Sequence, residues 1–526
     1  MSSLPHHSSR AGREPATLPA AADASSVAAG TSSVAAAAPP PPAPAGGRAP
    51  QRRSWQGVRA LLIRLHFSAG VFVAPFLVVT ALTGLLYAFA PQLDLLVHGD
   101  QLRVERVGST PQPLSEQVAA ARAAHPEGTL ASVVTPAAPE ETTRVVLSVP
   151  GLGEKQRTVF VDPYTGEVTG ALTTSSGSTP VTTWLSDLHG NLHLGEAGGL
   201  YSEMAASWLW VLAGVGLVLW AARGRRKGAK GAKGFRRLLL GDRNARGVRR
   251  TRSRHAVTGV WLAVGLLFLS ATGLTWSAHA GARFDALMER VSAPAPALDT
   301  SLRSAAGGPG DAHRAGDTPG HGGHDASGSA RQDTGSVAGI DPVLDAAREA
   351  GLAGPVELTP PAGAHHAWSV AQDDTVWPVR LDEVAVDPAT GEVTDRARFA
   401  DQPVPARLST LGIQAHMGRL FGLANQVLLA AIAVGLLLVI AWGYRMWWQR
   451  RPTRADRGAA PGPAPRRGAW RRLPLPVLAL GVPAVAFVGW ALPVLGVSLL
   501  LFLAVDVAAG LHRRRRRARD RMAADG

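Results

Sequence analysis

The stretch RLHFSAGVFVAPFLVVTALTGL, residues 64–85, occurs again in altered form as HAVTGVWLAVGLLFLSATGL, residues 255–274. In both copies a histidine precedes an apolar run, a glycine follows four positions later, and a Thr-Gly-Leu triplet lies near the far end. A constant shift of 189, without a gap, relates His66, Gly70 and Thr83 in the first copy to His255, Gly259 and Thr272 in the second. An internal repeat of this length indicates a fold built from two similar halves.

The repeat continues downstream with slightly different spacing. The sequence DPYTGEV at 162–168 recurs as DPATGEV at 387–393, which is a shift of 225. Five further positions recur with a shift of 227: His189, Gly195, Gly216, Trp220 and Arg223 become His416, Gly422, Gly443, Trp447 and Arg450. Each half therefore has two histidines, each expected at or near the start of a matched helix and a membrane boundary.

Apolar residues concentrate in segments of membrane-spanning length, because about 20 apolar residues cross a ~30 Å hydrocarbon core. The six segments are 66–90, 200–222, 256–277, 423–445, 473–491 and 493–511. The last two contain Pro476, Pro483 and Pro493 and are joined by almost no residues, so they predict a tight helical hairpin. The sequence thus predicts an integral membrane protein that contacts the lipid bilayer.

Basic residues gather on one side of the predicted membrane. The loop 223–254 has 14 Lys or Arg and one Asp, whereas 91–187 has 6 basic and 11 acidic residues and 277–422 has 11 and 19. Loops rich in Lys and Arg stay in the cytoplasm. Because topology accounts for the net charge of +15, nucleic acid is not an expected partner.

This charge distribution predicts the orientation. We expect a multi-pass protein of the cytoplasmic membrane with both termini, the loop 223–254 and the linker 446–472 in the cytoplasm. The connections 91–199 and 278–422 are expected outside. Residues 1–53 are rich in Ala, Pro and Ser, contain no signal-peptide core, and predict a disordered cytoplasmic tail.

The sequence contains no cysteine. This excludes disulfides, thiolate zinc sites, iron–sulfur clusters and covalently attached haem. A redox centre would have to be held by His, Met, Tyr or carboxylates. A serine-hydrolase elbow, an HExxH zinc motif and a P-loop are also absent, which argues against those enzyme classes.

Two small external α+β modules are predicted. In the first, 112–124 has helical periodicity, the alternating runs 143–149 and 156–161 predict strands, and 162–166 has the residues of a hairpin turn. In the second, the expected elements are a helix at 342–350, a strand-rich segment at 376–386 and a turn at 387–391. The Gly-, Ser-, Asp- and His-rich insertion 304–338 predicts disorder.

The motifs VDPYTGEV at 161–168 and VDPATGEV at 386–393 resemble the signature end of PepSY modules. The His-x-x-x-Gly…Thr-Gly helices and the Gly-x-x-x-Trp…Arg helix ends resemble the PepSY-associated transmembrane family, over about 60–450. That family includes bacterial inner-membrane ferric-siderophore reductases with two b-type haems. The resemblance implies transmembrane electron transfer to a ferric chelate. The matching haem-iron ligand candidates are His66, His189, His255 and His416.

The predicted fold is an all-α membrane core with four core helices in two repeats, a C-terminal helical hairpin and two extracytoplasmic PepSY-like modules. The predicted parts are the tail 1–53, TM helix 1 at 54–100, the first module at 101–182, an interfacial segment with TM helix 2 at 183–222, a basic cytoplasmic loop at 223–254, TM helix 3 at 255–280, a linker with the insertion at 281–338, the second module at 339–408, an interfacial segment with TM helix 4 at 409–448, a cytoplasmic linker at 449–472, the hairpin at 473–511 and a basic tail at 512–526. The hairpin and the insertion lie outside the family resemblance.

His66 and His255 are also ligand candidates on physical grounds. Ionisable residues within membrane segments are costly and are usually functional. Gly70 and Gly259 lie one turn deeper on the same helix face and leave room for a flat macrocycle. A repeat-related pair facing a pseudo-two-fold axis supplies bis-imidazole ligation. In the alternative interpretation, each histidine reaches the headgroups beside a neighbouring arginine.

His189 and His416 precede the second and fourth core helices on the outer side. The segment 184–192 predicts a short amphipathic helix in the membrane interface. His193 lies one turn beyond His189 and competes with it as the outer ligand. Other histidines are weaker candidates for ligands or metal sites: His98, His279, His313, His321, His324, His365 and His366.

We therefore expect electron transfer through two haem b groups, with His66 and His255 holding the cytoplasmic-side haem and His189 and His416 the outer one. Both irons would be six-coordinate, so substrate chemistry at iron is not expected, and no catalytic residue is assigned. The cytoplasmic or membrane electron donor is not identified by the sequence. The alternative is a non-redox membrane protein whose modules regulate a protease or sense a ligand. Metal transport is disfavoured because the helices lack clusters of carboxylates and methionines.

Overall fold

The computed structural model describes residues 49–226, 236, 239–241, 244–291, 297–302, 339–449 and 473–522. The elements discussed below belong to one compact unit that begins at Gln51. The insertion 304–338 with His313, His321 and His324, most of the linker 449–472, and the N-terminal stretch 1–48 lie outside the described residues.

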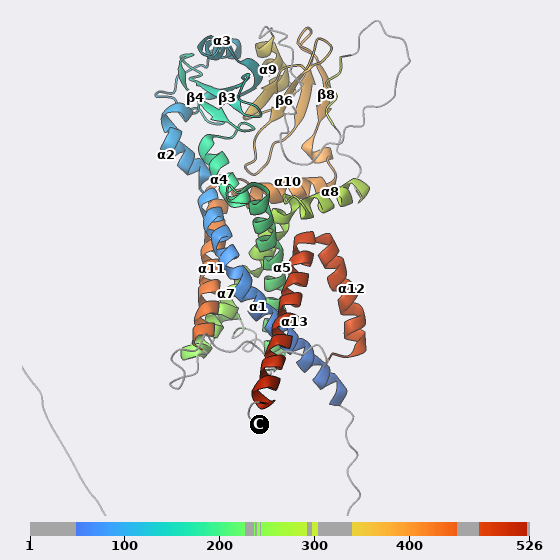
Figure 1. Cartoon of the computed structure of the whole chain (residues 1–526). Helices are drawn as coiled ribbons and strands as arrows, with labels where there is room; N and C mark the ends of the chain where they lie inside the picture. The colour runs from blue at the N-terminus through green and yellow to red at the C-terminus, as the bar shows by residue number, and fades with distance from the viewer. Residues whose placement is uncertain are drawn as a thin grey trace, which may run out of the picture. The chain divides into compact units, whose positions relative to one another are not determined.

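Long apolar helices form the membrane part of the protein (Figure 1). They are α1 (Ala49–Tyr87), α5 (Gly195–Arg226), α7 (Gly247–Thr275), α11 (Leu423–Trp448) and α13 (Pro493–Met522). In the described part of the chain these five contain segments long and apolar enough to cross a membrane. The sixth predicted segment forms α12 (Leu475–Ala491), whose 17 residues fall short of that length.

Shorter helices connect the long ones to the sheet. They are α2 (Ala90–Leu102), α4 (Pro180–Asn191), α8 (Ala280–Val291) and α10 (Val404–His416), with the 3-10 turn η1 (Phe399–Asp401) before α10. Helix α4 occupies the segment for which an interfacial helix was predicted. Helices α4 and α10 precede α5 and α11 respectively, so each half presents the same helix pair.

The α+β part is a single eight-stranded sheet in the order β4-β3-β2-β1-β5-β6-β7-β8. Its strands are β1 (Thr129–Val134), β2 (Thr143–Ser148), β3 (Gln156–Val161), β4 (Val168–Thr174), β5 (Val356–Thr359), β6 (Trp368–Gln372), β7 (Glu383–Val386) and β8 (Val393–Ala397). The two predicted modules are therefore joined: β1 pairs antiparallel with β5, with Val133 opposite Leu358 and Val134 opposite Glu357. The sequence could not reveal this pairing. Each module taken alone has β1 or β5 as a free edge strand, and its residue pattern does not indicate which strand it pairs with.

Helices α3 (Leu114–Ala124) and α9 (Ile340–Glu349) pack against this sheet (Figure 1). They bury Val118 and Val343, both fully inaccessible, in one apolar core shared by both halves. Ser115 on α3 donates to the carboxylate of Asp341 on α9, which links the two helices directly. The predicted combination of a helical membrane core with an α+β part is confirmed.

The two repeated Asp-Pro-x-Thr-Gly motifs form equivalent turns. The carboxylate of Asp162 accepts from the backbone N–H of Tyr164 at 2.8 Å, and that of Asp387 accepts from Ala389 at 2.8 Å. Gly166 has a φ of 74°, which favours glycine because a Cβ is strained there. The repeated motif is therefore explained by turn geometry between paired strands.

Two sequence expectations are corrected. Helix α1 begins at Ala49 and α7 at Gly247, so His66 and His255 lie well inside their helices rather than at the starts. The segment 376–386 is a strand only at its end, in β7, because residues 376–378, which include Pro378, form a bend and Arg380 makes only an isolated bridge to Asp374.

Candidate functional site

The first pair of histidines lies within the membrane helices. His66 on α1 and His255 on α7 face each other with ring centroids 6.2 Å apart and planes at 81°. Nδ1 of His255 lies 2.9 Å from the backbone carbonyl oxygen of Val439 on α11. A carbonyl only accepts hydrogen bonds, so Nδ1 carries the proton and Nε2 keeps its lone pair.

His66 has a nearly equivalent environment. The carbonyl of Leu212 on α5 acts on it, and Leu212 corresponds to Val439 under the same shift of 227 that relates the other positions of this part of the repeat. The contact falls outside hydrogen-bond geometry, so within the described residues Nδ1 of His66 is buried without a hydrogen-bond partner.

The second pair lies outside the candidate membrane spans. His189 on α4 and His416 on α10 have ring centroids 6.4 Å apart and planes at 53°. Nδ1 of His189 lies 3.0 Å from Oγ1 of Thr83, and Nδ1 of His416 lies 2.7 Å from Oγ1 of Thr272. The two threonines occupy the same position in the two repeats.

The threonine hydroxyls also fix the imidazole tautomer. Thr83 donates its proton to the carbonyl of Val79 at 3.0 Å, and Thr272 donates to Phe268 at 2.9 Å. Each hydroxyl has one proton, so with that proton on the backbone carbonyl it accepts from the histidine Nδ1–H. Nε2 is thus the free ring nitrogen. Metal-bound histidines characteristically donate their other N–H in this way.

Glycines lie against all four imidazoles. A Cβ added to Gly84 would lie 2.9 Å from Cε1 of His189, and one at Gly273 would lie 3.4 Å from Cε1 of His416. At the inner pair, Gly216 and Gly443 take the same role, with distances of 3.4 Å to His66 and 3.8 Å to His255. The absence of side chains here lets the rings pack closely against the neighbouring helix.

Short helices place the outer histidines. Helix α4 is capped by Thr179, whose hydroxyl also donates to Asp94 on α2. Asp94 accepts a second hydrogen bond from Thr182 at 2.5 Å. At α10, the side-chain amide of Asn425 donates to the carbonyl of Ala415 at 2.8 Å, next to His416. Each helix is therefore fixed by side-chain hydrogen bonds to a neighbouring helix.

The electrostatic environment keeps the outer imidazoles neutral. Burial lowers the pKa of His189 to about 4. Burial, with a smaller contribution from the charge of His189, lowers the pKa of His416 to about 4. Neutral imidazole is the form that binds a metal ion.

The spacing of each pair suits two imidazoles on opposite sides of one metal ion. Two metal–nitrogen bonds of about 2.0–2.1 Å, with roughly 1.1 Å from each nitrogen to its ring centre, give a centroid separation of about 6.3 Å. The observed separations are 6.2 and 6.4 Å. Both separations therefore suit two imidazoles that would share one metal ion, as in a bis-imidazole haem site, and at His189, His255 and His416 the nitrogen left for the metal is Nε2.

Other sequence candidates lie elsewhere. His193 is exposed, and its ring centroid lies 5.1 Å from that of Trp184. His279 binds the buried carboxylate of Glu203 at 3.3 Å. Among the described residues no group of three or more His, Cys, Asp or Glu could hold a metal ion by itself.

Gly70 and Gly259 were predicted to leave space beside His66 and His255, but neither glycine contacts an imidazole. A Cβ on Gly70 would meet Leu212 at 3.9 Å, and one on Gly259 would meet no atom within 4 Å. The glycines that touch the imidazoles come instead from neighbouring helices. Thr83 and Thr272 were visible as repeated residues, but their hydrogen bonds depend on helices that are distant in sequence.

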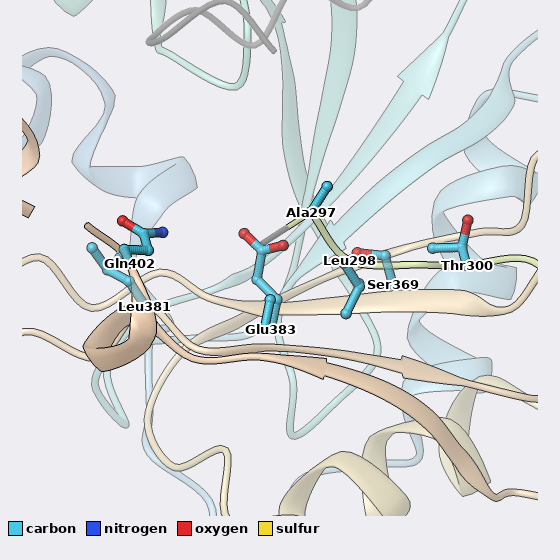
Figure 2. A pocket seen from close by; sticks show the side chains of 8 residues that line it. Ala297, Leu298, Thr300, Ser369, Leu381, Glu383 and Gln402 are labelled. Atoms are coloured by element: carbon cyan, nitrogen blue, oxygen red, sulfur yellow. The ribbon is translucent and has the colours of Figure 1, made fainter. Parts of the chain in front are cut away.

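A separate cavity lies in the second half of the sheet (Figure 2). It has a volume of about 330 Å³ and is lined by Ala297, Leu298, Thr300, Ser369, Leu381, Glu383, Ala397 and Gln402. Glu383 is its single acidic lining residue, and no imidazole lines it. The cavity is therefore distinct from both histidine pairs.

A known protein family matches the part of the chain that contains both histidine pairs and the sheet. A family model described as "PepSY-associated TM region" matches residues 63–450, about three quarters of the chain. The match includes all four paired histidines and both halves of the sheet, and it leaves out α12 and α13. No curated protein matches the sequence.

Proposed function

The chain belongs to the PepSY-associated transmembrane family, and from this premise we propose that it transfers electrons across a membrane through two b-type haems. The observation that carries the proposal is the presence of two imidazole pairs, each contributed by two different helices. Their ring centroids are 6.2 and 6.4 Å apart, and three of the four Nδ1 atoms are engaged by acceptors that leave Nε2 free.

The positions of the pairs suit transfer across the bilayer. Along α1, His66 belongs to one pair, and Gly84, which touches His189 of the other pair, lies five turns further on. At 5.4 Å per turn, five turns correspond to about 27 Å along the helix. The hydrocarbon core is ~30 Å thick, so this separation would put the pairs near its opposite edges.

Each haem supplies a one-electron redox centre, and the protein supplies its placement. His66 with His255 would hold the inner group, and His189 with His416 the outer one. With two imidazoles holding each group, neither iron would offer a site for a substrate. The acceptor would therefore receive electrons at the outer edge, without binding to the metal.

The orientation follows from charge. The first turns of α7, next to His255, include Arg249, Arg250, Arg252 and Arg254, all exposed. Basic residues flank the cytoplasmic side of membrane helices, which supports an inner pair on the cytoplasmic side of the cytoplasmic membrane. The acceptor we propose is a ferric chelate, such as a ferric siderophore, on the outer face. This makes the chain a ferric-siderophore reductase-like oxidoreductase.

The alternative function is a non-redox membrane protein whose sheet regulates a protease or binds a ligand. In this interpretation a small ligand would bind at the cavity of the sheet that Glu383 lines. In that case the histidines would pack and anchor helices without a cofactor.

Purified full-length protein distinguishes the two. We expect two haems per chain and a reduced-minus-oxidised spectrum of b type. His66→Ala and His255→Ala should each remove the same haem, and His189→Ala and His416→Ala the other. His193→Ala is the matched control and should retain both.

A folded, colourless wild-type protein would refute electron transfer and favour the alternative. If His66→Ala and His255→Ala lose haems with different spectra, the two histidines do not bind the same haem and the proposed inner pair is wrong. Loss of the outer haem in His193→Ala, with retention in His189→Ala, would transfer the ligand role to His193.

A further inference from the structure

Helix α13 lies outside the region matched by the family model, yet it packs on the first repeat at three depths. Near the inner end, Nη2 of Arg64 on α1 lies 2.5 Å from Oδ1 of Asp506. Further along, Nε1 of Trp208 on α5 donates to Oγ of Ser498 at 2.9 Å. Leu495, only 3% exposed, enters the apolar cluster between α1 and α5.

These contacts use residues that the second repeat does not share. Under the shift of 189 the counterpart of Arg64 is Ser253, and under the shift of 227 the counterpart of Trp208 is Gly435. Gly435 packs directly on α7, where an added Cβ would lie 2.6 Å from Leu262. The first repeat thus contacts α13 through the guanidinium of Arg64 and the indole of Trp208. At the position of Trp208, the second repeat has a glycine on α11 that packs against α7 of the same repeat.

The ion pair between Arg64 and Asp506 lies within membrane-spanning segments, where charged side chains are rare. Asp506 lies within a candidate membrane span, and Arg64 lies within the span of α1. Ionisable residues in membrane helices are costly and are usually functional. Arg64 stands two positions before His66, and its side chain is only 15% exposed. Side chains at i and i+2 leave a helix on different faces, so the charge of Arg64 acts on whatever His66 holds at a distance, through surroundings less screened than bulk water.

We propose that α13 tunes the inner redox centre: Asp506 neutralises Arg64 and so keeps the reduction potential of the group held by His66 and His255 from rising. The proposal rests on the proposed haem function. With haem bound, the inner group would take one electron from the donor and pass the same electron to the outer group, so that reduction and reoxidation balance. Arg64 and Asp506 neither gain nor lose electrons; they shift only the equilibrium of that reduction.

The test compares charge with packing. In Asp506→Asn the uncompensated Arg64 should favour the reduced inner centre by about tenfold, for a unit charge on the order of 10 Å away, which is on the order of 59 mV for one electron. Arg64→Gln should shift the potential the opposite way, and the double variant should return close to wild type. The potential of the outer centre should not move in any of them.

Ser498→Ala is the control, because it removes an uncharged contact of the same helix. It should lower the melting temperature without moving either potential. A second readout is independent of haem. The chain has no cysteine, so introduced cysteines are the only thiols. A short bis-thiol-reactive reagent should cross-link α1 to α13 in the double variant Arg64→Cys/Asp506→Cys. It should not form a cross-link in the control Ser253→Cys/Asp506→Cys.

The outcomes separate the two proposals. Two haems with an unchanged inner potential in both single charge variants would overturn the tuning role and leave electron transfer standing. Equal shifts in Ser498→Ala and Asp506→Asn would assign the effect to packing and also overturn it. A wild-type protein that folds without haem would overturn the proposed function and the tuning role with it, even if the cross-link forms.

Discussion

Replacing Gly84 by alanine adds one methyl group next to the imidazole of His189 and so tests the geometry of the outer site. The added Cβ would lie 2.9 Å from Cε1 and 3.3 Å from Nδ1 of His189. Ordinary van der Waals contact begins at 3.4 Å, so the imidazole must retreat by roughly 0.5 Å. Sites of this kind tolerate displacements of about 0.5 Å, so the ligand is pushed to the limit of productive geometry.

The repeat supplies the matched control. In Gly273→Ala the added Cβ lies 3.4 Å from Cε1 of His416, which is an ordinary contact. Both glycines lie within helices, where alanine is better than glycine by roughly 0.5–1 kcal/mol. Overpacking at Gly84 costs about 1–3 kcal/mol. Gly273→Ala should therefore stabilise the protein slightly, and Gly84→Ala should destabilise it by up to about 2.5 kcal/mol.

The assay is thermal unfolding of both purified variants together with the spectrum and content of the outer haem. We expect Gly84→Ala to melt at a lower temperature and to lose or alter the outer haem, while the inner haem is unchanged. If the two variants behave alike in both measurements, the His189 ring does not pack on Gly84 and the outer pair is misplaced. The unfolding measurement holds whether or not haem is bound.

Three further predictions concern the same region and the topology. Thr83→Val and Thr272→Val remove the acceptor of one histidine Nδ1–H each; each should cost about 0.5–1.5 kcal/mol of stability and alter the spectrum of the outer haem alone, whereas an altered inner haem would contradict the assignment. In haem-free protein, His189 and His416 have pKa values lowered to about 4 from an ordinary 6.5, so the unfolded state binds more protons between these pH values. Stability should therefore be full above pH 6.5, fall as the pH drops towards about 4 and level off below it, and chemical unfolding of a His189→Gln/His416→Gln variant should show a flatter profile. A reporter fused within the loop 223–254 should behave as cytoplasmic, and extracytoplasmic behaviour there would reverse which haem is inner.

The repeat made the four histidines predictable. Each was recognisable because it recurred at a constant offset, and the structure places them in the two pairs that the offsets indicate. Their partners were not predictable. The contact between Thr83 and His189 joins α1 to α4 across 106 residues, and no periodicity within either helix encodes it.

Two errors have local physical causes. Hydropathy marks only the apolar part of a helix, so the turns of α1 that carry Arg59 and Arg64 were not counted and His66 was placed at the helix start. Helical spacing put Gly70 on one face with His66, but space beside an imidazole is decided by the neighbouring helix. There the relevant residue is Gly216 on α5.

The junction of β1 with β5 has a consequence for the origin of the chain. Val133 faces Leu358, and the shift between them is 225, the same as between the two turn motifs. An edge strand that pairs antiparallel with its own counterpart at the same position is what an isologous dimer produces. A single half-length polypeptide with a free β1 edge would therefore assemble with a second copy into the same sheet, and each histidine pair would then contain the same histidine from both copies. Fusion of the two copies makes that association independent of concentration, and it lets one half acquire features, such as Arg64 and Trp208, that the other half lacks.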